Sequence, residues 1–266
     1  MKTLRTVLRY RGLLVALTGR ELKARYRGSA LGFLWSLANP LLLLAVFAAV
    51  FGLFLGPRAG DASAPHPFVL FLVCGLFPWI WTNNTLLEGT QSLSSNAGLI
   101  RRASFPLEIL PAVTVSAQLV HFLLALPILV LALVLGRLLG YSVLGLPSLL
   151  VPVAIALHLL MLSGMVLGLS SLSVHFKDVR DLLANVLQLL FFLAPIIYSI
   201  EFAGRYGRWL HLNPFTPFTL AYQSLLYGGT LPPATIWLEM AGWSVLSWLL
   251  GSWIFTRLRE TVAEAV

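Results

Sequence analysis

The chain has 266 residues; 58% are hydrophobic, only 11% are charged, and the mean hydropathy is +0.87. A soluble domain carries about 25% charged residues, so this composition excludes an ordinary water-soluble protein. The length accommodates about six membrane spans and their loops but no second soluble domain, and the net charge of +8 indicates basic membrane flanks rather than binding to nucleic acid.

The N-terminal segment, residues 1–30, is basic and amphipathic. Val7 and Leu8 fall near one face of a helix, whereas Arg5 and Arg9 follow the helical spacing of another. The segment is expected to lie as a helix on the membrane surface, either as a basic anchor or as a docking surface for a partner. A capping box in Thr-Gly-Arg-Glu, residues 18–21, predicts that a second helix begins there.

Charged side chains are missing from four long stretches. They lie between Arg27 and Arg58, between Asp61 and Glu88, between Glu108 and Arg137, and between Arg137 and Lys177. Each stretch exceeds the roughly 20 residues that a helix needs to cross a bilayer. Charge is costly in hydrocarbon, and a soluble helix needs a polar face, so these stretches indicate membrane-spanning helices. The expected fold is an all-α integral membrane protein with about six transmembrane helices, at residues 34–55, 67–89, 107–135, 146–172, 183–200 and 236–256.

The basic residues divide unequally between the two sides that these spans define. Fourteen of the 18 lysines and arginines fall on the side of both termini, and the other side holds Arg58, Arg137, Arg205 and Arg208. The positive-inside rule therefore predicts a multi-pass membrane protein with both termini in the cytoplasm.

The segment 201–235, before the last span, is external, moderately apolar and broken by Pro214, Pro217, Pro232 and Pro233. Its apolar pieces are too short to span a membrane, so we expect external re-entrant half-helices. Its aromatic residues favour a membrane-interface belt, and a rim that binds sugar or lipid is the alternative.

Several kinds of chemistry are absent from the sequence. A Walker A loop needs glycine directly before lysine, and the three lysines, Lys2, Lys23 and Lys177, follow Met, Leu and Phe. The span interiors hold essentially no carboxylate, which argues against an ion-coupled carrier. His121 and His158 are isolated in spans and are expected to be packed core residues, and no cluster has metal-ligand spacing. A transport protein without a P-loop or a coupling carboxylate needs energy from elsewhere, which points to a separate ATPase subunit without proving one.

Several motifs, in order along nearly the whole chain, resemble one family. They are RELKARYRGSALGFLW at 20–35 followed by Asn39-Pro40, Phe105-Pro106, FKDVRD at 176–181, APIIY at 194–198 and LNPF at 212–215. This pattern resembles the ABC-2 type permeases that export polysaccharides, the membrane subunits of O-antigen and teichoic-acid exporters. One departure is Ala194, where the family often has serine.

The resemblance implies a single ABC-2 transmembrane domain over residues 1–266. It implies two permease copies and two nucleotide-binding ATPase subunits, with ATP and Mg on the partner subunit and no cofactor on this chain. It also implies that residues 1–30 form the cytoplasmic interface helix and that a cytoplasmic coupling helix lies at about 93–105. The matching residues for the ATPase-subunit contact are Arg101, Arg102, Lys177, Asp178, Arg180 and Asp181.

The family's conduit runs between the two permeases, lined mainly by spans one and five. The aromatic residues that match it are Trp35, Phe47, Phe51, Phe54, Phe191, Phe192 and Tyr198. Aromatic walls contact the C–H faces of sugars without fixed hydrogen bonds, which suits a sliding polymer. Packing or lipid contact is the alternative role for each of them.

Arg25 and Arg27 lie at the cytoplasmic membrane edge, where basic side chains attract a lipid pyrophosphate. Topology alone would also place them there. The expected function is a permease subunit, not an enzyme, of an ATP-driven exporter that moves a lipid-linked, O-antigen-like or teichoic-acid-like polysaccharide. The alternatives are an ABC-2 permease for a drug or lipid, a membrane-embedded glycolipid-processing enzyme, and a non-catalytic membrane scaffold.

Overall fold

The structure is a computed structural model that describes residues 2–28, 38, 41–42, 45–46, 49–50, 68–102, 106–141 and 143–265. Over these residues it is all-helical, with no strand. The α-helices are α1 (Lys2–Arg9), α2 (Arg11–Tyr26), α4 (Phe68–Thr90), α5 (Ala97–Arg102), α6 (Ile109–Leu138), α7 (Val151–His175), α8 (Val179–Leu193), α9 (Gly207–Leu210), α10 (Thr216–Tyr222) and α11 (Ala234–Ala265). Shorter turns of other helix types are η2 (Ser94–Asn96), η3 (Leu146–Leu150), η4 (Ile200–Tyr206) and η5 (Gln223–Tyr227).

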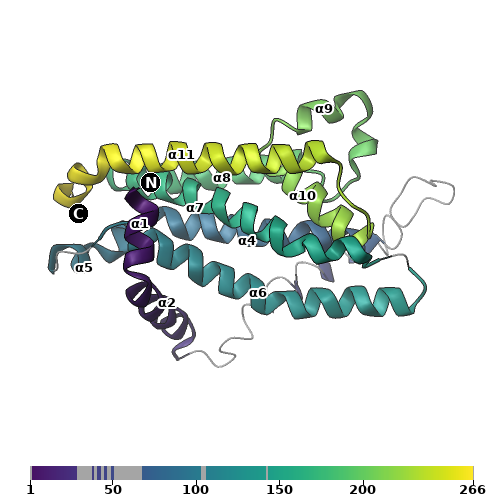
Figure 1. The fold of residues 1–266 in the computed structure, drawn as a ribbon, viewed down its shortest axis with the longest axis horizontal. Coiled ribbons are helices and arrows are strands. Elements are labelled where there is room, and N and C mark those ends of the chain that lie inside the picture. The colour runs from purple at the N-terminus through teal and green to yellow at the C-terminus, as the bar shows by residue number, and fades with distance from the viewer. Residues whose placement is uncertain are drawn as a thin grey trace.

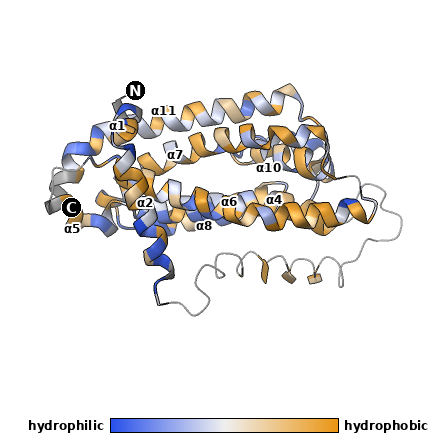
Figure 2. Ribbon diagram, turned by 60° about the horizontal axis from the view of Figure 1, so that its bottom comes forward, coloured by the Kyte–Doolittle hydropathy of each residue, from blue (hydrophilic) through white to orange (hydrophobic). Residues whose placement is uncertain are grey.

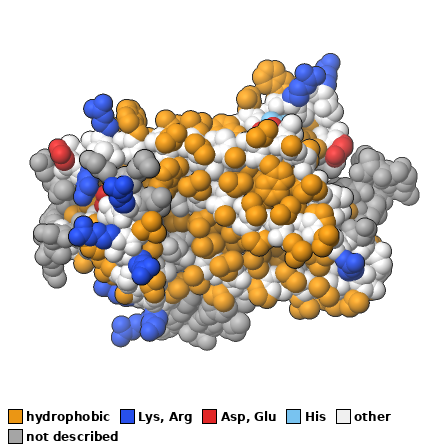
Figure 3. Space-filling view, viewed as in Figure 1, with side chains coloured by type: hydrophobic (Ala, Val, Ile, Leu, Met, Phe, Trp, Pro, Cys, Tyr) orange, Lys and Arg blue, Asp and Glu red, His pale blue; other side chains and the backbone are white. Residues whose placement is uncertain are grey.

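The long helices α4, α6, α7 and α11 run lengthwise side by side, with both termini and α5 at one end and α9 at the other (Figure 1). Hydrophilic residues gather around α1, α2, α5 and the C-terminus (Figure 2). Apolar side chains cover the middle of the face in Figure 3, and charged side chains lie toward its two ends. An apolar band between charged ends is the distribution that a bilayer requires.

Three helices of the described chain are long and apolar enough to cross a membrane: Phe68–Thr90, Ile109–Leu138 and Leu146–His175. They correspond to the predicted spans 67–89, 107–135 and 146–172, which supports an all-α integral membrane protein. The predicted first span, 34–55, lies largely outside the described residues.

The predicted span 183–200 differs from the observed helix. Helix α8 begins earlier, at Val179, and ends at Leu193 after 15 residues. Pro195 explains the end, because proline has no N–H to donate and disfavours helical backbone in the residue before it, here Ala194. The helix at the last predicted span, 236–256, is also longer than expected, because α11 runs from Ala234 to Ala265 over 32 residues.

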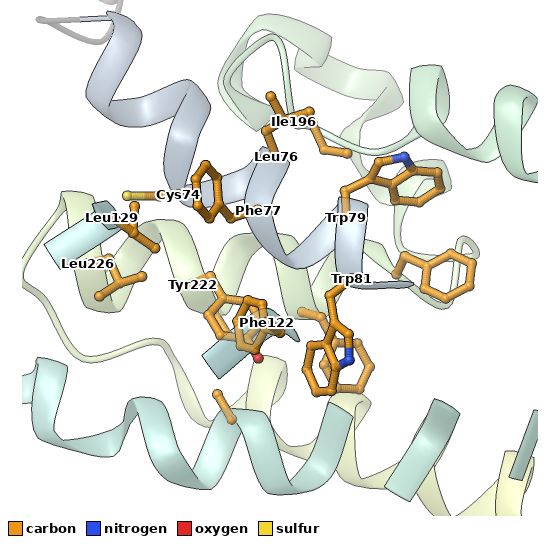
Figure 4. Close-up of a cluster of buried hydrophobic side chains, with 14 of the residues drawn as sticks. Cys74, Leu76, Phe77, Trp79, Trp81, Phe122, Leu129, Ile196, Tyr222 and Leu226 are labelled. Carbon is orange, nitrogen blue, oxygen red and sulfur yellow. The ribbon is translucent and has the colours of Figure 1, made fainter. Parts of the chain in front are cut away.

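Helix α4 lies at the centre of the core. Figure 4 shows its side chains Cys74, Leu76, Phe77, Trp79 and Trp81 among residues of other elements. The Trp81 ring stacks on Phe122 of α6 with centroids 4.5 Å apart. His158 of α7 is buried, and its Nε2 atom lies 2.8 Å from the Thr82 hydroxyl. The expectation that His158 is a hydrogen-bonded core residue is therefore confirmed.

The segment 201–235 forms short helical pieces, and α10 is packed into the core against α4, α7 and α11. Phe215, Phe218 and Tyr222 are buried. The favoured interpretation of this segment's aromatic residues as a membrane belt is therefore wrong for these three, and Tyr206 and Trp209 are the exposed ones.

The N-terminal helices differ from the prediction in one respect. The break falls at Tyr10, between α1 and α2, whereas Thr18 lies inside α2, where its side chain is buried. The capping-box prediction at residues 18–21 is therefore wrong. Both helices contact α6, and tertiary packing overrides the local start signal.

Candidate functional site

Helix α8 buries only one side. Leu187 is fully buried, and Leu183, Leu190 and Phe191 pack against the core formed by the neighbouring helices. The remainder of the helix surface is exposed in the single chain. A helix of a membrane protein with this much uncovered surface faces lipid, another subunit or an aqueous path.

The uncovered surface of α8 contains a polar strip. Asp181, Asn185, Gln188 and Phe192 are spaced by four, three and four residues, so they lie on one line along the helix. All four are exposed, with Phe192 at 56%. Neither amide has a hydrogen-bond partner among the described residues. Lipid tails cannot satisfy an amide, and an unpaired amide in hydrocarbon is costly, so this strip indicates a polar surrounding.

An apolar strip lies beside the polar one. It consists of exposed side chains at the adjoining helical positions, namely Leu182, Val186, Leu189 and Leu193. The two strips give α8 three distinct sides: one in the core of the protomer, one apolar and open, and one that carries two amides and an aromatic ring.

The end of α8 is held by two amide side chains from the following segment. Asn213 Nδ2 donates to the carbonyl of Leu190 at 2.9 Å, and Asn213 Oδ1 accepts from the backbone N–H of Phe215 at 3.0 Å. Gln223 Nε2 donates to the carbonyl of Pro195 at 2.8 Å. The first bond satisfies a carbonyl in the last turn of α8, which would otherwise lack a partner. The sequences APIIY and LNPF are thus two parts of one junction.

The described aromatic residues of the predicted conduit occupy different surroundings. Phe191 is half-buried against Trp79 of α4, with ring centroids 5.6 Å apart. Phe192 is exposed on the polar strip, and the Tyr198 hydroxyl donates to its carbonyl at 3.1 Å. Phe192 and Tyr198 therefore lie together at the open end of α8, whereas Phe191 has a packing role. Trp35, Phe47, Phe51 and Phe54 lie outside the described residues.

Arg25 joins α2 to two membrane helices. Its guanidinium forms a two-pronged pair with Glu88 of α4, in which Nη1 donates to Oε1 at 2.8 Å and Nη2 donates to Oε2. Gln118 of α6 donates to the same Glu88 Oε2 at 2.6 Å. Arg25 is thus occupied by a carboxylate in this conformation, whereas Arg27 is exposed just beyond the end of α2.

The predicted ATPase-contact residues lie in two loops at the end of the molecule that carries both termini. Arg101 and Arg102 end α5, a short helix within the predicted coupling segment 93–105, and their side chains are outside the described part. Lys177, Asp178, Arg180 and Asp181 are all exposed at the turn into α8. Asp181 is in the first turn of α8, where a negative charge is favourable.

A packed base lies beneath α5 and is formed by the ends of α6, α7 and α11. Leu99 and Ile100 of α5 pack against a second apolar cluster, which consists of Leu93, Leu107, Leu110, Leu167, Phe255 and Val262. Next to it, the buried carboxylate of Glu108 pairs with Arg259 of α11 at 3.1 Å. His175 Nε2 lies 3.0 Å from the Thr261 hydroxyl. The base therefore ties the ends of α6, α7 and α11 together beneath α5.

Sequence reasoning missed four residues of these arrangements: Asn185, Gln188, Glu88 and Gln118. The signal for the first two was present, since two amides three residues apart interrupt an otherwise apolar span and precede Phe192 by helical spacings. Glu88 and Gln118 gave no such signal, because Arg25 and Glu88 are 63 residues apart in the chain. Among the described residues, no group of three or more His, Cys, Asp and Glu side chains is arranged to hold a metal ion.

Comparison with known proteins assigns this chain to a family. The protein-family model described as "ABC-2 type transporter" matches residues 12–227. The chain is 33% identical over 270 residues to the O-antigen export system permease protein RfbA of Myxococcus xanthus, with 100% of both chains covered. Two Klebsiella pneumoniae proteins of the same name are 31% and 30% identical over 255 residues, which cover 95% of this chain and 94% of each relative. The resemblance seen in the motifs is confirmed, and the chain belongs to the ABC-2 type transporter family.

Proposed function

We propose that this protein is the permease subunit of an ATP-driven exporter that moves a lipid-linked polysaccharide across the plasma (inner) membrane. The observation that carries the proposal is the similarity over the full chain to O-antigen export permeases at 33% identity. The exposed amides of α8 support it independently, because a hydroxyl-rich chain can satisfy Asn185 and Gln188 where lipid cannot.

The working unit in this proposal is a dimer of permeases with two ATPase subunits. The polar strips of two α8 helices, together with residues of the first span, line the path between the copies. Amides that exchange hydrogen bonds with successive hydroxyl groups, and rings such as Phe192 that contact C–H faces, hold each sugar weakly. Weak repeated contacts allow a polymer to slide, whereas one deep site would retain it. The adjoining strip of Leu182, Val186 and Leu189 faces the partner copy or lipid.

The energy comes from the partner. None of the three lysines of this chain follows a glycine, so the chain has no Walker A loop, and ATP and Mg belong to the ATPase subunit. In the proposed complex the ATPase contacts α5 and the turn at Lys177–Asp181. The apolar cluster beneath α5 transmits the movement of this contact to α6, α7 and α11. This arrangement makes the chain a transport component rather than an enzyme.

The proposed topology has six spans, cytoplasmic termini, residues 1–30 as the interface segment, and 201–235 as an external re-entrant segment within one domain of residues 1–266. The excess of basic residues at the termini supports it. Arg27, and Arg25 after release from Glu88, attract the lipid pyrophosphate of the substrate at the cytoplasmic edge. A pyrophosphate offers Arg25 the same two-pronged acceptor geometry that Glu88 supplies in this structure.

The decisive experiment is reconstitution of the purified permease with and without its Walker-containing ATPase in proteoliposomes. The complex is expected to hydrolyse ATP faster when lipid-linked glycan is present, and to move that glycan across the bilayer. The permease alone is expected to do neither. The matched control is the lipid carrier without glycan, which should stimulate ATP hydrolysis much less. Equal stimulation by the bare carrier would instead indicate a lipid permease, and absence of any complex would refute the export assignment.

A further inference from the structure

The last turn of α6 lies at the end of the molecule opposite both termini (Figure 1). A cavity lies beside this turn. It has a volume of about 240 Å³ and is lined by Arg137, Tyr141, Val143, Leu144, Gly145, Gly228 and Gly229. Arg137 is the only charged residue in this lining. The cavity belongs neither to the polar strip of α8 nor to the loops at the other end.

The position of Arg137 is fixed by its own loop. Its Nη1 atom donates to the carbonyl of Val143 at 3.3 Å and to the carbonyl of Leu144. Its other donors, Nε and Nη2, have no acceptor among the described residues, and no described carboxylate pairs with it. A guanidinium carries five donors, so the residue keeps a positive charge and free donors on the cavity wall.

Much of the remaining cavity wall is backbone from two closely packed loops. Leu144 has a φ of 57°, which is unusual for a bulky residue and is maintained by its N–H bond to the carbonyl of Leu226 at 3.1 Å. A Cβ on Gly145 would overlap the backbone of Gly229, so the two loops touch there. The described residues of the two loops therefore hold each other in place beside the cavity.

The surroundings of the cavity are apolar. Leu138, Leu139 and Leu146 are next to it in the chain and are exposed by 78%, 77% and 81%. Transfer of leucine side chains this exposed from water into a bilayer is favourable. Tyr141, half-exposed between them, is a residue type that favours the membrane–water boundary. Basic pockets beside membrane helices bind anionic lipid headgroups, and a cationic cavity at that boundary has the same chemistry.

We propose that this cavity binds the phosphate of an anionic phospholipid headgroup in the outer leaflet. The outer-leaflet location rests on the topology of the proposed function; the binding itself does not. Arg137 supplies charge-assisted hydrogen bonds to the phosphate oxygens, Tyr141 adds a hydroxyl donor, and the glycines leave room for the headgroup beside the backbone. The acyl chains lie against the exposed leucines.

The test is native mass spectrometry of the purified permease–ATPase complex incubated with phosphatidylglycerol or, as the neutral comparison, phosphatidylcholine. Arg137→Gln is expected to weaken phosphatidylglycerol binding about ten-fold, the loss of one charge-assisted interaction. Arg205→Gln is the matched control, because Arg205 is exposed at the same end but lies over the Tyr206 ring and lines no such cavity. Its binding should equal that of the parent protein.

Because Arg137 also fixes the 143–144 loop, Tyr141→Ala provides a second variant that leaves those bonds intact. It is expected to weaken phosphatidylglycerol binding several-fold even if Arg137→Gln fails to fold. Displacement of the lipid by millimolar inorganic phosphate would mean that the site recognises a free anion instead. Unchanged lipid binding in Tyr141→Ala and in folded Arg137→Gln overturns the proposal. Since this readout involves no transport, its failure leaves the export function untouched.

Discussion

Gly164 of α7 and Gly251 of α11 bring two helix backbones into direct contact. A Cβ on Gly251 would overlap the carbonyl of Gly164, and a Cβ on Gly164 would overlap the backbone of Ser247. Ser244 adds a hydrogen bond from its hydroxyl to the carbonyl of Leu157 at 2.7 Å along the same interface. Small residues permit this close approach, as they do in other membrane helix pairs.

Gly251→Ala is therefore expected to destabilise the protein by about 1–3 kcal/mol, because the helices must separate to admit the methyl group. Gly242→Ala is the control: the same helix has open space there, and the substitution should stabilise by about 1 kcal/mol through helix propensity. Cys74 is the only cysteine of the chain and is fully buried, so reaction with a thiol-specific dye during heating reports unfolding. Equal melting temperatures for the two variants would contradict the contact.

The Arg25–Glu88 pair gives a second prediction. Arg25→Ala and Glu88→Ala should each weaken the docking of α2 on α4. The expected loss of docking free energy is only about 1 kcal/mol, because the pair is partly exposed to water. The exchanged double variant Arg25→Glu with Glu88→Arg should recover part of the loss. Hydrogen–deuterium exchange over residues 11–26 measures the docking of α2. Additive effects of the single substitutions, without recovery in the exchanged variant, would show that the pair does not hold the helix.

The stability of α2 docking should also depend on pH through Glu21. Burial raises the pKa of this carboxyl above its ordinary value of 4.5; the Arg25 cation opposes the shift and the Glu88 carboxylate adds to it. The folded state therefore holds the proton more tightly than the unfolded chain. Ionisation costs stability in full above the folded-state pKa, and this cost disappears as the pH falls below 4.5.

Glu21→Gln is accordingly expected to melt at a higher temperature than the parent protein at pH 7.5, with the difference shrinking as the pH falls toward 4.5. Tryptophan fluorescence during heating, recorded over a pH series, measures this. A parent protein that is the more stable of the two at neutral pH would reverse the sign and refute the argument.

The polar strip of α8 predicts a selective transport defect. Replacing Asn185 and Gln188 together with leucine should reduce glycan export several-fold, while assembly and basal ATP hydrolysis persist, because no described residue hydrogen-bonds to either amide. Val186→Ala with Leu189→Ala alters the adjoining strip to a similar extent and serves as the control. Export in proteoliposomes is the measurement. An export defect in the control pair but not in the amide pair would place the path on the apolar strip.

Tyr198→Phe isolates the junction at the open end of α8. It removes only the hydroxyl that donates to the Phe192 carbonyl at 3.1 Å and keeps the ring. Export should fall modestly, by about the two- to ten-fold that the loss of one hydrogen bond corresponds to. Tyr198→Ala, which also removes the ring, should reduce export further without an equal loss of ATP hydrolysis. Equal loss of both activities in an assembled complex would argue against a role in guiding the glycan.

The ATPase contact predicts uncoupling. Replacing Arg101 and Arg102 together with alanine should preserve ATP hydrolysis and lower the glycan exported per ATP. The corresponding change of Arg205 and Arg208, at the opposite end, keeps the net charge matched. Unchanged coupling in the first variant would remove these two arginines from the proposed contact.

Much of the fold was predictable because charged side chains are costly in the hydrocarbon core of a bilayer, so their absence marks the spans. The absence of charge between Glu108 and Arg137 predicted α6. Gly164 and Gly168 have the spacing of a membrane-helix packing motif, and both lie against α11. The partner glycine, Gly251, was not predictable, since a single glycine in α11 looks like any other. Likewise the capping box at Thr18 was outweighed by packing of α2 on α6, and the aromatic residues of α10 suited an interface and a core equally well.

The candidate site was predictable only in part, and for a related reason. The family resemblance pointed to Phe192 and Tyr198, whereas the predicted span 183–200 ran past the end of α8 at Leu193, where Pro195 stops the helix. Which ring faces inward depends on how α8 is rotated about its own axis. The observed rotation packs Phe191 against Trp79. The occupation of Arg25 by Glu88 is a contact between distant parts of the chain that local spacing cannot reveal.

Asn213 and Gln223 have a mechanical consequence for any working cycle. Through them the last turn of α8 and the proline after it are fastened to the start and end of α10. If α8 tilts or slides, it must either break both bonds or pull α10 along with it. In the proposed exporter, a movement of α8 that widens the space between the permease copies would therefore also displace α10 from its contacts with α4, α7 and α11.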